Sequence, residues 1–234
     1  DSLLLELSYK GQIDERICYL NVPDAEIADT RERMYLACRL GKRYSYLRKD
    51  FTLLIPEVLW YPTTVPPENP GSPYDNSRDF TRYSLRVRNY GKNKVISQGM
   101  RMKKGDQFVF RNESPLPGLT LNIGDYVTRQ LIVDSVTYEL HVWRKHASLL
   151  KLLNDRLLPS PVREGTSARS IIRGARHVAE ISAGNKYPYK RFQLVETPLD
   201  FTSYFRNEMK CSGFVQPEVL YFPERGFGTK IFSS

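Results

Sequence analysis

The sequence predicts a mainly β protein, with a saddle-shaped antiparallel β-sheet or sandwich domain followed by a small, truncated α/β unit. The aromatic and proline content favours strands and loops over a helical bundle, because the 234 residues include 15 Tyr, 11 Phe and 15 Pro. Short apolar segments alternate with turns over residues 1–143, as they do in antiparallel sheets. After Trp143 the spacing of the apolar residues becomes helical.

Length and composition set the class of protein. The chain is long enough for one large domain or two small ones, and its 41% hydrophobic and 26% charged residues exclude a disordered chain. No window approaches the roughly 18 consecutive apolar residues of a membrane-spanning helix. The first residue is Asp1 and not Met, which suggests a processed or excised piece of a longer protein.

The strands of the N-terminal region are predicted from alternating apolar residues bounded by turns. The segments expected to form strands are 3–9, 13–20, 44–47, 51–55, 83–89, 94–98, 107–111, 119–123 and one long run, 126–143. Residues 63–80 are rich in Pro, Gly, Asn and Ser, and they predict a long loop that is either disordered or a flap over a cleft.

A helix is predicted at residues 166–183, where apolar residues recur every three or four positions. Thr166 or Ser167 can cap its N-terminus, and Gly184 with Asn185 provides a left-handed stop. Strands at 192–195 and 219–222 follow it. We therefore predict an antiparallel β domain at 1–145 and an incomplete α/β unit at 146–234, which is thin for an independent core.

The net charge of +9 permits binding to nucleic acid or to an anionic surface but does not require it. The Lys and Arg residues are scattered along the sequence without an RNP, helix-turn-helix or zinc-finger pattern, so a solvated surface is expected and no nucleic-acid partner. Cys18, Cys38 and Cys211 are widely spaced and can form at most one disulfide, with one thiol left over.

The residues alone give no complete catalytic site. His141, His146 and His177 form no HExxH or H-x-H pair, so they are expected at surface or boundary positions and not as metal ligands. The sequence also lacks a GxSxG elbow, a Walker loop and a dinucleotide-binding glycine pattern. No catalytic residue and no metal ligand is predicted in this chain.

The order of motifs nevertheless resembles a known family. After the helix come Tyr-Pro-Tyr at 187–189, the strand-like RFQLVETP, an aromatic-rich loop and the apolar run VLYF at 219–222. Upstream lie LWYP at 59–62 and LNIGDY at 121–126. These segments in this order are similar to the aminopeptidase N family of zinc metallopeptidases, especially to Bacteroidetes proteins in which a peptidase-like module is fused to an ABC-type permease.

The resemblance implies a saddle-shaped N-terminal domain followed by the start of a thermolysin-like catalytic domain. The zinc motif of the family, HExxH with a later glutamate, would lie beyond Ser234, so zinc is expected only in a longer parent protein and no cofactor in this segment. The family's Gly-x-Met-Glu-Asn loop corresponds to SGFVQ at 212–216. Val215 therefore stands where the family has the glutamate that holds a substrate amine.

The function expected from the resemblance is a fragment of a zinc aminopeptidase-like extracytoplasmic protein, which forms one wall of a peptide-binding cleft and is not catalytic by itself. The residues expected to bind substrate are Trp60, Tyr61, Phe214, Gln216 and Glu218, with Glu218 close enough to compensate for Val215. The alternative is a non-catalytic extracytoplasmic binding or interaction domain of an ABC-type transporter.

The resemblance also implies the partners and the location. The expected partners are the remainder of the chain's own catalytic domain, a peptide or protein ligand, and a membrane reached through the parent chain. The expected location is the periplasmic side of a bacterial membrane. Whether the parent protein is an active enzyme or a degenerate relative stays open.

Overall fold

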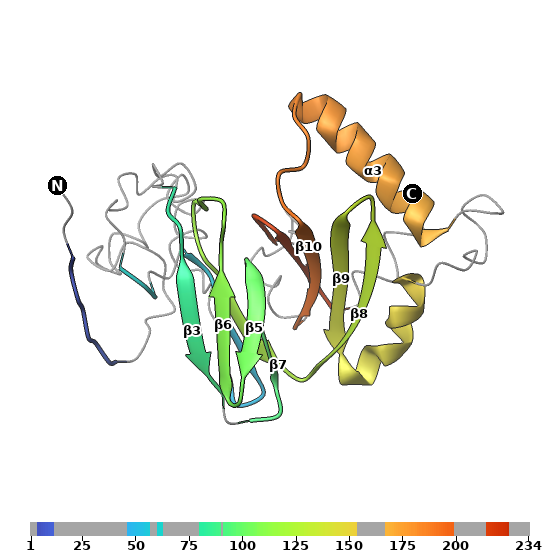
Figure 1. The fold of residues 1–234 in the computed structure, drawn as a ribbon. Coiled ribbons are helices and arrows are strands. Elements are labelled where there is room, and N and C mark those ends of the chain that lie inside the picture. Colours follow the sequence, from blue (N-terminus) through green and yellow to red (C-terminus); the bar gives the residue numbers. More distant parts are fainter. Residues whose placement is uncertain are drawn as a thin grey trace, which may run out of the picture.

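The computed structural model of the chain describes residues 4–11, 46–56, 60–62, 80–89, 91–153, 167–198 and 214–224. In this part the chain forms three β-sheets, one α-helix and one 3-10 helix (Figure 1). The predicted mainly β class is confirmed. The predicted loop at 63–80 lies outside the described residues, apart from its last position.

Two antiparallel sheets make up the first half of the fold. The four-stranded sheet has the order β1 (Tyr46–Leu47), β2 (Phe51–Leu54), β7 (Leu121–Gly124) and β4 (Lys94–Ser97). The three-stranded sheet has the order β3 (Ser84–Arg88), β6 (Gln107–Arg111) and β5 (Met100–Lys104).

A shared hydrophobic core joins these two sheets. Phe108 and Phe110 of the three-stranded sheet pack with Leu54, Val95 and Leu121 of the four-stranded sheet. Each such buried aromatic or aliphatic side chain contributes on the order of 2 kcal/mol through its removal from water. The alternating sequence pattern predicts this arrangement, in which the apolar face of one sheet packs against the apolar face of the other.

The five-stranded sheet is mixed. Its order is β11 (Phe214–Gln216), β12 (Val219–Pro223), β10 (Arg191–Thr197), β9 (Val136–Trp143) and β8 (Tyr126–Val133). The three central strands are mutually parallel, and the two edge strands pair antiparallel. The sheet joins strands from both sides of residue 145, the predicted domain boundary, which itself stays a prediction.

Helix α3 (Ala168–Ala183) confirms the predicted helix and both of its ends. The Ser167 and Ser170 side chains form a reciprocal capping box, and Gly184 ends the helix with φ 66°. Arg173 and Arg176 form ion pairs of 2.8 and 2.7 Å with Asp134 at the β8–β9 turn, which attach the helix to the sheet (Figure 1). The segment that directly follows β9 forms the 3-10 helix η2 (Arg144–Leu153).

Two strand predictions were wrong. Residues 4–11 form no strand, because no described strand pairs with them, and Leu4 is 95% exposed. The predicted partner at 13–20 lies outside the described residues. The long run 126–143 is a hairpin and not one strand, since Asp134 and Ser135 have φ of 47° and 67° and form a tight two-residue turn.

Substitutions at the two glycines that flank β5 test the packing of this region. Gly99 has φ 81°, and a Cβ there would lie 2.4 Å from the Arg111 carbonyl oxygen, whereas Gly105 has φ 61° with nothing within 4 Å. We expect Gly105→Ala to cost about 1 kcal/mol of unfolding free energy through backbone strain. Gly99→Ala should cost about 1–3 kcal/mol more, because the backbone must also move. Urea unfolding measures both losses, and equal losses would contradict this packing.

Candidate functional site

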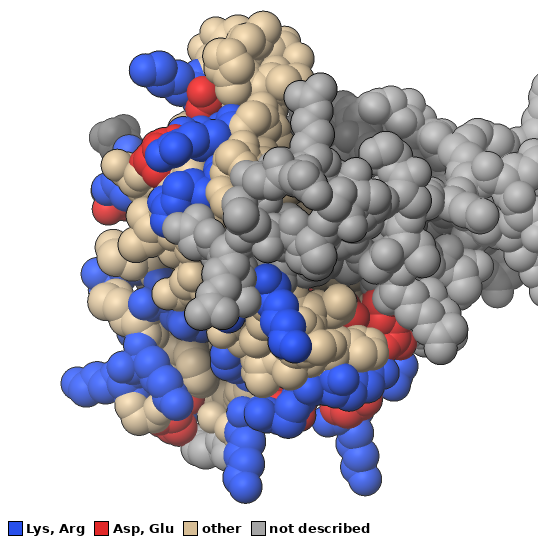
Figure 2. All heavy atoms as spheres, turned by 90° about the vertical axis from the view of Figure 1, so that its right-hand side faces the viewer, with Lys and Arg blue, Asp and Glu red and all other residues tan. Residues whose placement is uncertain are grey.

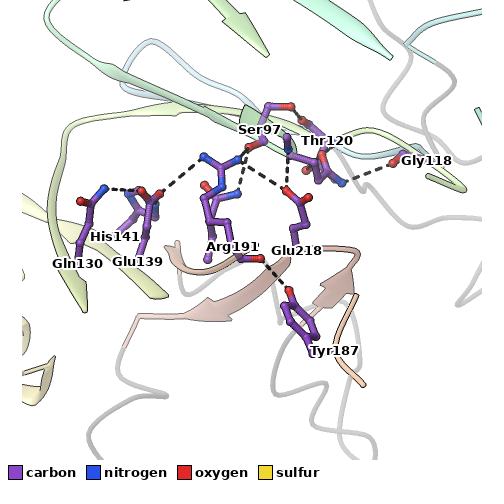
Figure 3. Close-up of polar contacts among 12 residues, drawn as sticks. Ser97, Gly118, Thr120, Gln130, Glu139, His141, Tyr187, Arg191 and Glu218 are labelled. Atoms are coloured by element: carbon purple, nitrogen blue, oxygen red, sulfur yellow. Dashed lines mark hydrogen bonds and ion pairs between the residues drawn. The ribbon is translucent and has the colours of Figure 1, made fainter. Parts of the chain in front are cut away.

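The three sheets meet at a short backbone segment, residues 97–99, which we call the sheet corner. Here the chain passes from β4 of the four-stranded sheet to β5 of the three-stranded sheet. The Ser97 carbonyl oxygen accepts hydrogen bonds from Arg191 Nη2 (2.8 Å) and Gln193 Nε2 (3.0 Å), both on β10 of the five-stranded sheet. The Gly99 amide donates to Glu218 Oε2 at 2.7 Å (Figure 3).

Buried side chains complete the hydrogen bonding around the sheet corner. Gln98 Oε1 accepts from the Thr120 amide (2.8 Å) and from the Thr120 hydroxyl (3.0 Å). Because the single Thr120 hydroxyl proton is used there, the Tyr221 hydroxyl donates to Thr120 Oγ1 at 2.8 Å. Burial raises the pKa of Tyr221 and keeps it a neutral donor. The Ser97 carbonyl, the Gln98 side chain and the Gly99 amide thus all have hydrogen-bond partners inside the protein, which restricts the geometry of the corner, although Arg191 Nε is buried without one.

An open cleft of about 440 Å³ lies beside the sheet corner. Four cationic and three carboxylate side chains face it, so it matches a ligand that carries both charges. The lining residues are Gly99, Met100, Arg101, Arg111, Glu113, Ser114, Gln130, Thr137, Glu139, Pro188, Tyr189, Lys190, Arg191 and Glu218.

Glu218 reaches the cleft from the two-residue turn between β11 and β12. Its φ of 64° is uncommon for a residue other than glycine, and such strained positions cluster at functional sites. Its side chain is 11% exposed, and Arg191 Nη2 lies 3.8 Å from Oε2. Burial raises the pKa of Glu218, although the Gly99 amide and the Arg191 charge oppose that rise.

Arg191 lies between two carboxylates. Its Nη1 is 3.9 Å from Glu139 Oε2, on the opposite side from Glu218 (Figure 3). Burial lowers the pKa of Arg191, and the two carboxylates counteract that effect. A guanidinium keeps its proton at any physiological pH, so Arg191 is a fixed positive charge at the base of the cleft.

A chain of hydrogen bonds holds Glu139 from behind. Lys94 Nζ donates to Thr128 Oγ1 (2.6 Å), Thr128 donates to His141 Nδ1 (2.8 Å), and His141 Nε2 donates to Glu139 Oε2 (3.1 Å). This donor order fits a neutral imidazole, and burial lowers the pKa of His141. Burial opposes the ionisation of Glu139, but the His141 hydrogen bond and the Arg191 and Arg101 charges hold the Glu139 pKa below its ordinary value.

The expectation that the histidines lie at the surface or a boundary is wrong for His141, which is fully buried. Polar and apolar residues alternate along β9, and His141 lies on the face of the strand that carries the polar ones. There its ring bonds Thr128 of the neighbouring strand β8. His146 is a boundary residue, 30% exposed, with Nδ1 2.7 Å from Glu196 Oε1. His177 is exposed on α3.

Glu218 is the one predicted site residue found among the described lining of the cleft. Trp60 and Tyr61 instead bracket Leu119: Trp60 Nε1 donates to its carbonyl oxygen (3.3 Å), and its amide donates to Tyr61 Oη (3.1 Å). Phe214 and Gln216 belong to edge strand β11, with Gln216 5% exposed. Any role of these four in ligand binding stays a prediction.

Sequence reasoning missed Arg191, Glu139 and the sheet corner. Glu139 gave a usable signal, because a carboxylate in an otherwise apolar strand requires a partner when both faces of the strand are buried. Arg191 directly follows Tyr-Pro-Tyr-Lys and begins the apolar strand β10, which is a similar signal. The corner gave none, since its partners lie about a hundred residues away in the sequence.

The described residues contain no group of three or more His, Cys, Asp or Glu side chains that could hold a metal ion. They therefore do not fit the zinc site of a metallopeptidase, and we assign no zinc to them. No helix in the described part of the chain is long and apolar enough to cross a membrane.

Comparison with known proteins gave matches in structure only. No protein-family model and no curated protein matches the sequence. An aminopeptidase N family protein from Idiomarina loihiensis is 13% identical with a TM-score of 0.40, over 77% of this chain and 26% of that one. Legionella pneumophila aminopeptidase A in complex with aspartic acid is 9% identical with a TM-score of 0.45, over 76% of this chain and 19% of that one.

Both neighbours carry aminopeptidase names. This chain spans about a quarter or less of the length of each neighbour. The predicted fusion to an ABC-type permease stays a prediction.

The buried His141 predicts a pH dependence of stability. Its pKa is lowered in the folded protein, so below its ordinary value of 6.5 the unfolded chain binds a proton that the folded chain does not. Stability should therefore fall as the pH decreases through 6.5, with a slope of up to about 1.4 kcal/mol per pH unit. Urea unfolding as a function of pH measures the slope, and His141→Gln should reduce it.

His177→Gln is the matched control, because this histidine is exposed on α3. We expect the wild-type slope in that variant. A slope in His141→Gln as steep as in the wild type would show that His141 is not held neutral.

Proposed function

We propose that this chain is a peptidase-related fragment that forms one wall of a peptide-binding cleft and is not catalytic by itself. The observation that carries the proposal is the pairing of a buried carboxylate, Glu218, with a fixed guanidinium, Arg191, 3.8 Å apart at the cleft. The ammonium group of a peptide can donate a hydrogen bond to the Glu218 carboxylate. The carbonyl or carboxylate oxygens of the peptide can bind the cations of the cleft.

Glu218 is the residue we assign to the peptide amine. Val215, at the position of the family's amine-binding glutamate, is 67% exposed on β11 and carries no charge. Glu218 lies three residues later and lines the cleft, with its carboxylate pointing toward Arg191 (Figure 3). A hydrogen bond between charged groups contributes about 1.5–3 kcal/mol, which is enough to select ligands with a free N-terminus.

The rest of the proposal concerns a longer protein. Its remaining catalytic domain would supply the opposite wall and the zinc ligands, and its membrane segments would hold the cleft on the extracytoplasmic side. A second candidate is a non-catalytic binding domain of an ABC-type transporter. It is favoured by Val215, because a cleft without the family's glutamate can bind peptides and yet lack aminopeptidase specificity.

Calorimetric titration of the chain with a short peptide tests the assignment. We expect Glu218→Gln to weaken binding of a peptide with a free amine about tenfold or more. Acetylating the peptide should weaken its binding to the wild type by a similar factor. It should weaken binding to the variant little, because the contact between the amine and Glu218 is already lost there.

Glu113→Gln is the matched control, since it removes the same charge from the same cleft. The Glu113 carboxylate is exposed and pairs with Lys190 at 3.2 Å, so its loss should change the affinity by no more than about twofold. Equal binding of free and acetylated peptides by the wild type would contradict the assignment. Peptide hydrolysis by the 234-residue chain alone would contradict the proposed non-catalytic role.

A further inference from the structure

Six cations gather in the three-stranded sheet, although they are separated in the sequence. Strands β3, β5 and β6 contain no Asp or Glu, and their basic residues are Arg86, Arg88, Arg101, Lys103, Lys104 and Arg111. Opposed residues in neighbouring antiparallel strands point to the same face of the sheet. The strand register therefore decides how these charges are displayed.

The register places four of the six cations on one face, which we call the basic face. Its three cross-strand rows are Ser84–Arg111–Met100, Arg86–Val109–Met102 and Arg88–Gln107–Lys104. The opposite face carries the buried Phe108 and Phe110, with Lys103 lying 5.2 Å from the Phe108 ring. Every row of the basic face thus carries at least one positive charge.

The basic face is open to solvent. All four of its cations are exposed, and none forms an ion pair with another described residue. Met100 and Met102 lie on the same face as these cations and are 58% and 43% exposed. On the side of the molecule that Figure 2 shows, the right-hand side of Figure 1, Lys and Arg also cover more of the described surface than Asp and Glu.

We propose that the basic face docks on a bilayer surface that contains anionic phospholipids. Four cations on one face attract phosphate headgroups, and each Lys or Arg near such a surface strengthens binding about fivefold. The exposed methionines add apolar, flexible groups that can enter the boundary between headgroups and acyl chains. The strand register places both kinds of group on the same face of the sheet, where they can reach a bilayer surface together.

The placement of the aromatic rings favours lipid over nucleic acid. Proteins that bind single strands on a sheet stack the bases on exposed aromatic side chains. In this sheet Phe108 and Phe110 are 9% and 1% exposed and face the core, and the three rows of the basic face contain no aromatic residue. The basic face can therefore attract phosphate groups, but it offers no aromatic surface on which bases could stack.

Co-sedimentation of the chain with vesicles tests the proposal. We expect binding to phosphatidylcholine vesicles that contain phosphatidylglycerol, weaker binding as salt is added, and none to pure phosphatidylcholine. Replacing Arg88 and Lys104 by Gln should lower the partition coefficient roughly 30-fold, about fivefold for each charge. The control is the double variant Lys151→Gln with Lys186→Gln, which removes two exposed cations elsewhere and should change it by no more than about twofold.

Three outcomes would overturn the proposal. The first is equal loss of vesicle binding in the two double variants, which would show that net charge alone decides. The second is equal binding to vesicles with and without phosphatidylglycerol. The third is tighter binding to a single-stranded oligonucleotide than to the anionic vesicles, which would assign the basic face to nucleic acid.

Discussion

The hydrogen bonds of the backbone at residues 97–99 hold the described sheets of this protein together. Buried polar groups are costly unless they have partners, so a corner that satisfies its own carbonyl, amide and side chain leaves little freedom to the elements around it. Ser97 receives two donors from β10, Gly99 donates to the β11–β12 turn, and Gln98 binds the segment before β7. The cleft is lined by Gly99 of this corner and by its partners Arg191 and Glu218, so the same hydrogen bonds set its shape.

The electrostatics of the cleft follow from the same geometry. Arg191 is shared by two carboxylates whose surroundings differ. Glu139 receives donors from His141 and Gln130, and these donors with the nearby cations favour its charged form. Glu218 receives one amide donor and is dominated by burial, so its pKa is raised. Glu218 is therefore the carboxylate that gains most from the ammonium group of a ligand, while Glu139 keeps Arg191 in place.

Local signals in the sequence were enough to predict much of the fold. The capping serine and Gly184 fix α3, and alternating residues fix β4, β6 and β9, because these features need only neighbours along the chain. The hairpin turn at Asp134 and Ser135 was missed, since neither residue is the glycine that marks most such turns. Strand β5 was missed because its basic and methionine residues do not form an apolar pattern.

Non-local contacts could not be predicted from the sequence. Glu218 was chosen from a resemblance, but its contact with Gly99 spans 119 residues and depends on how the sheets pack. The basic face depends in the same way on strand register, which assembles charges from three separate segments. Trp60 and Tyr61 were chosen from the resemblance of LWYP at 59–62, and their hydrogen bonds with Leu119, 59 and 58 residues away, could not be read from the sequence.

The central claim is that the sheet corner holds a buried, ligand-responsive carboxylate at Glu218. The amide proton of Gly99 reports on it directly, because its NMR shift changes when the hydrogen-bonded carboxylate takes up a proton. The claim predicts a titration midpoint above the ordinary value of 4.5, lowered by a peptide with a free amine and not by its acetylated form. A midpoint at or below 4.5, or a Gly99 shift that ignores both pH and peptide, would contradict it.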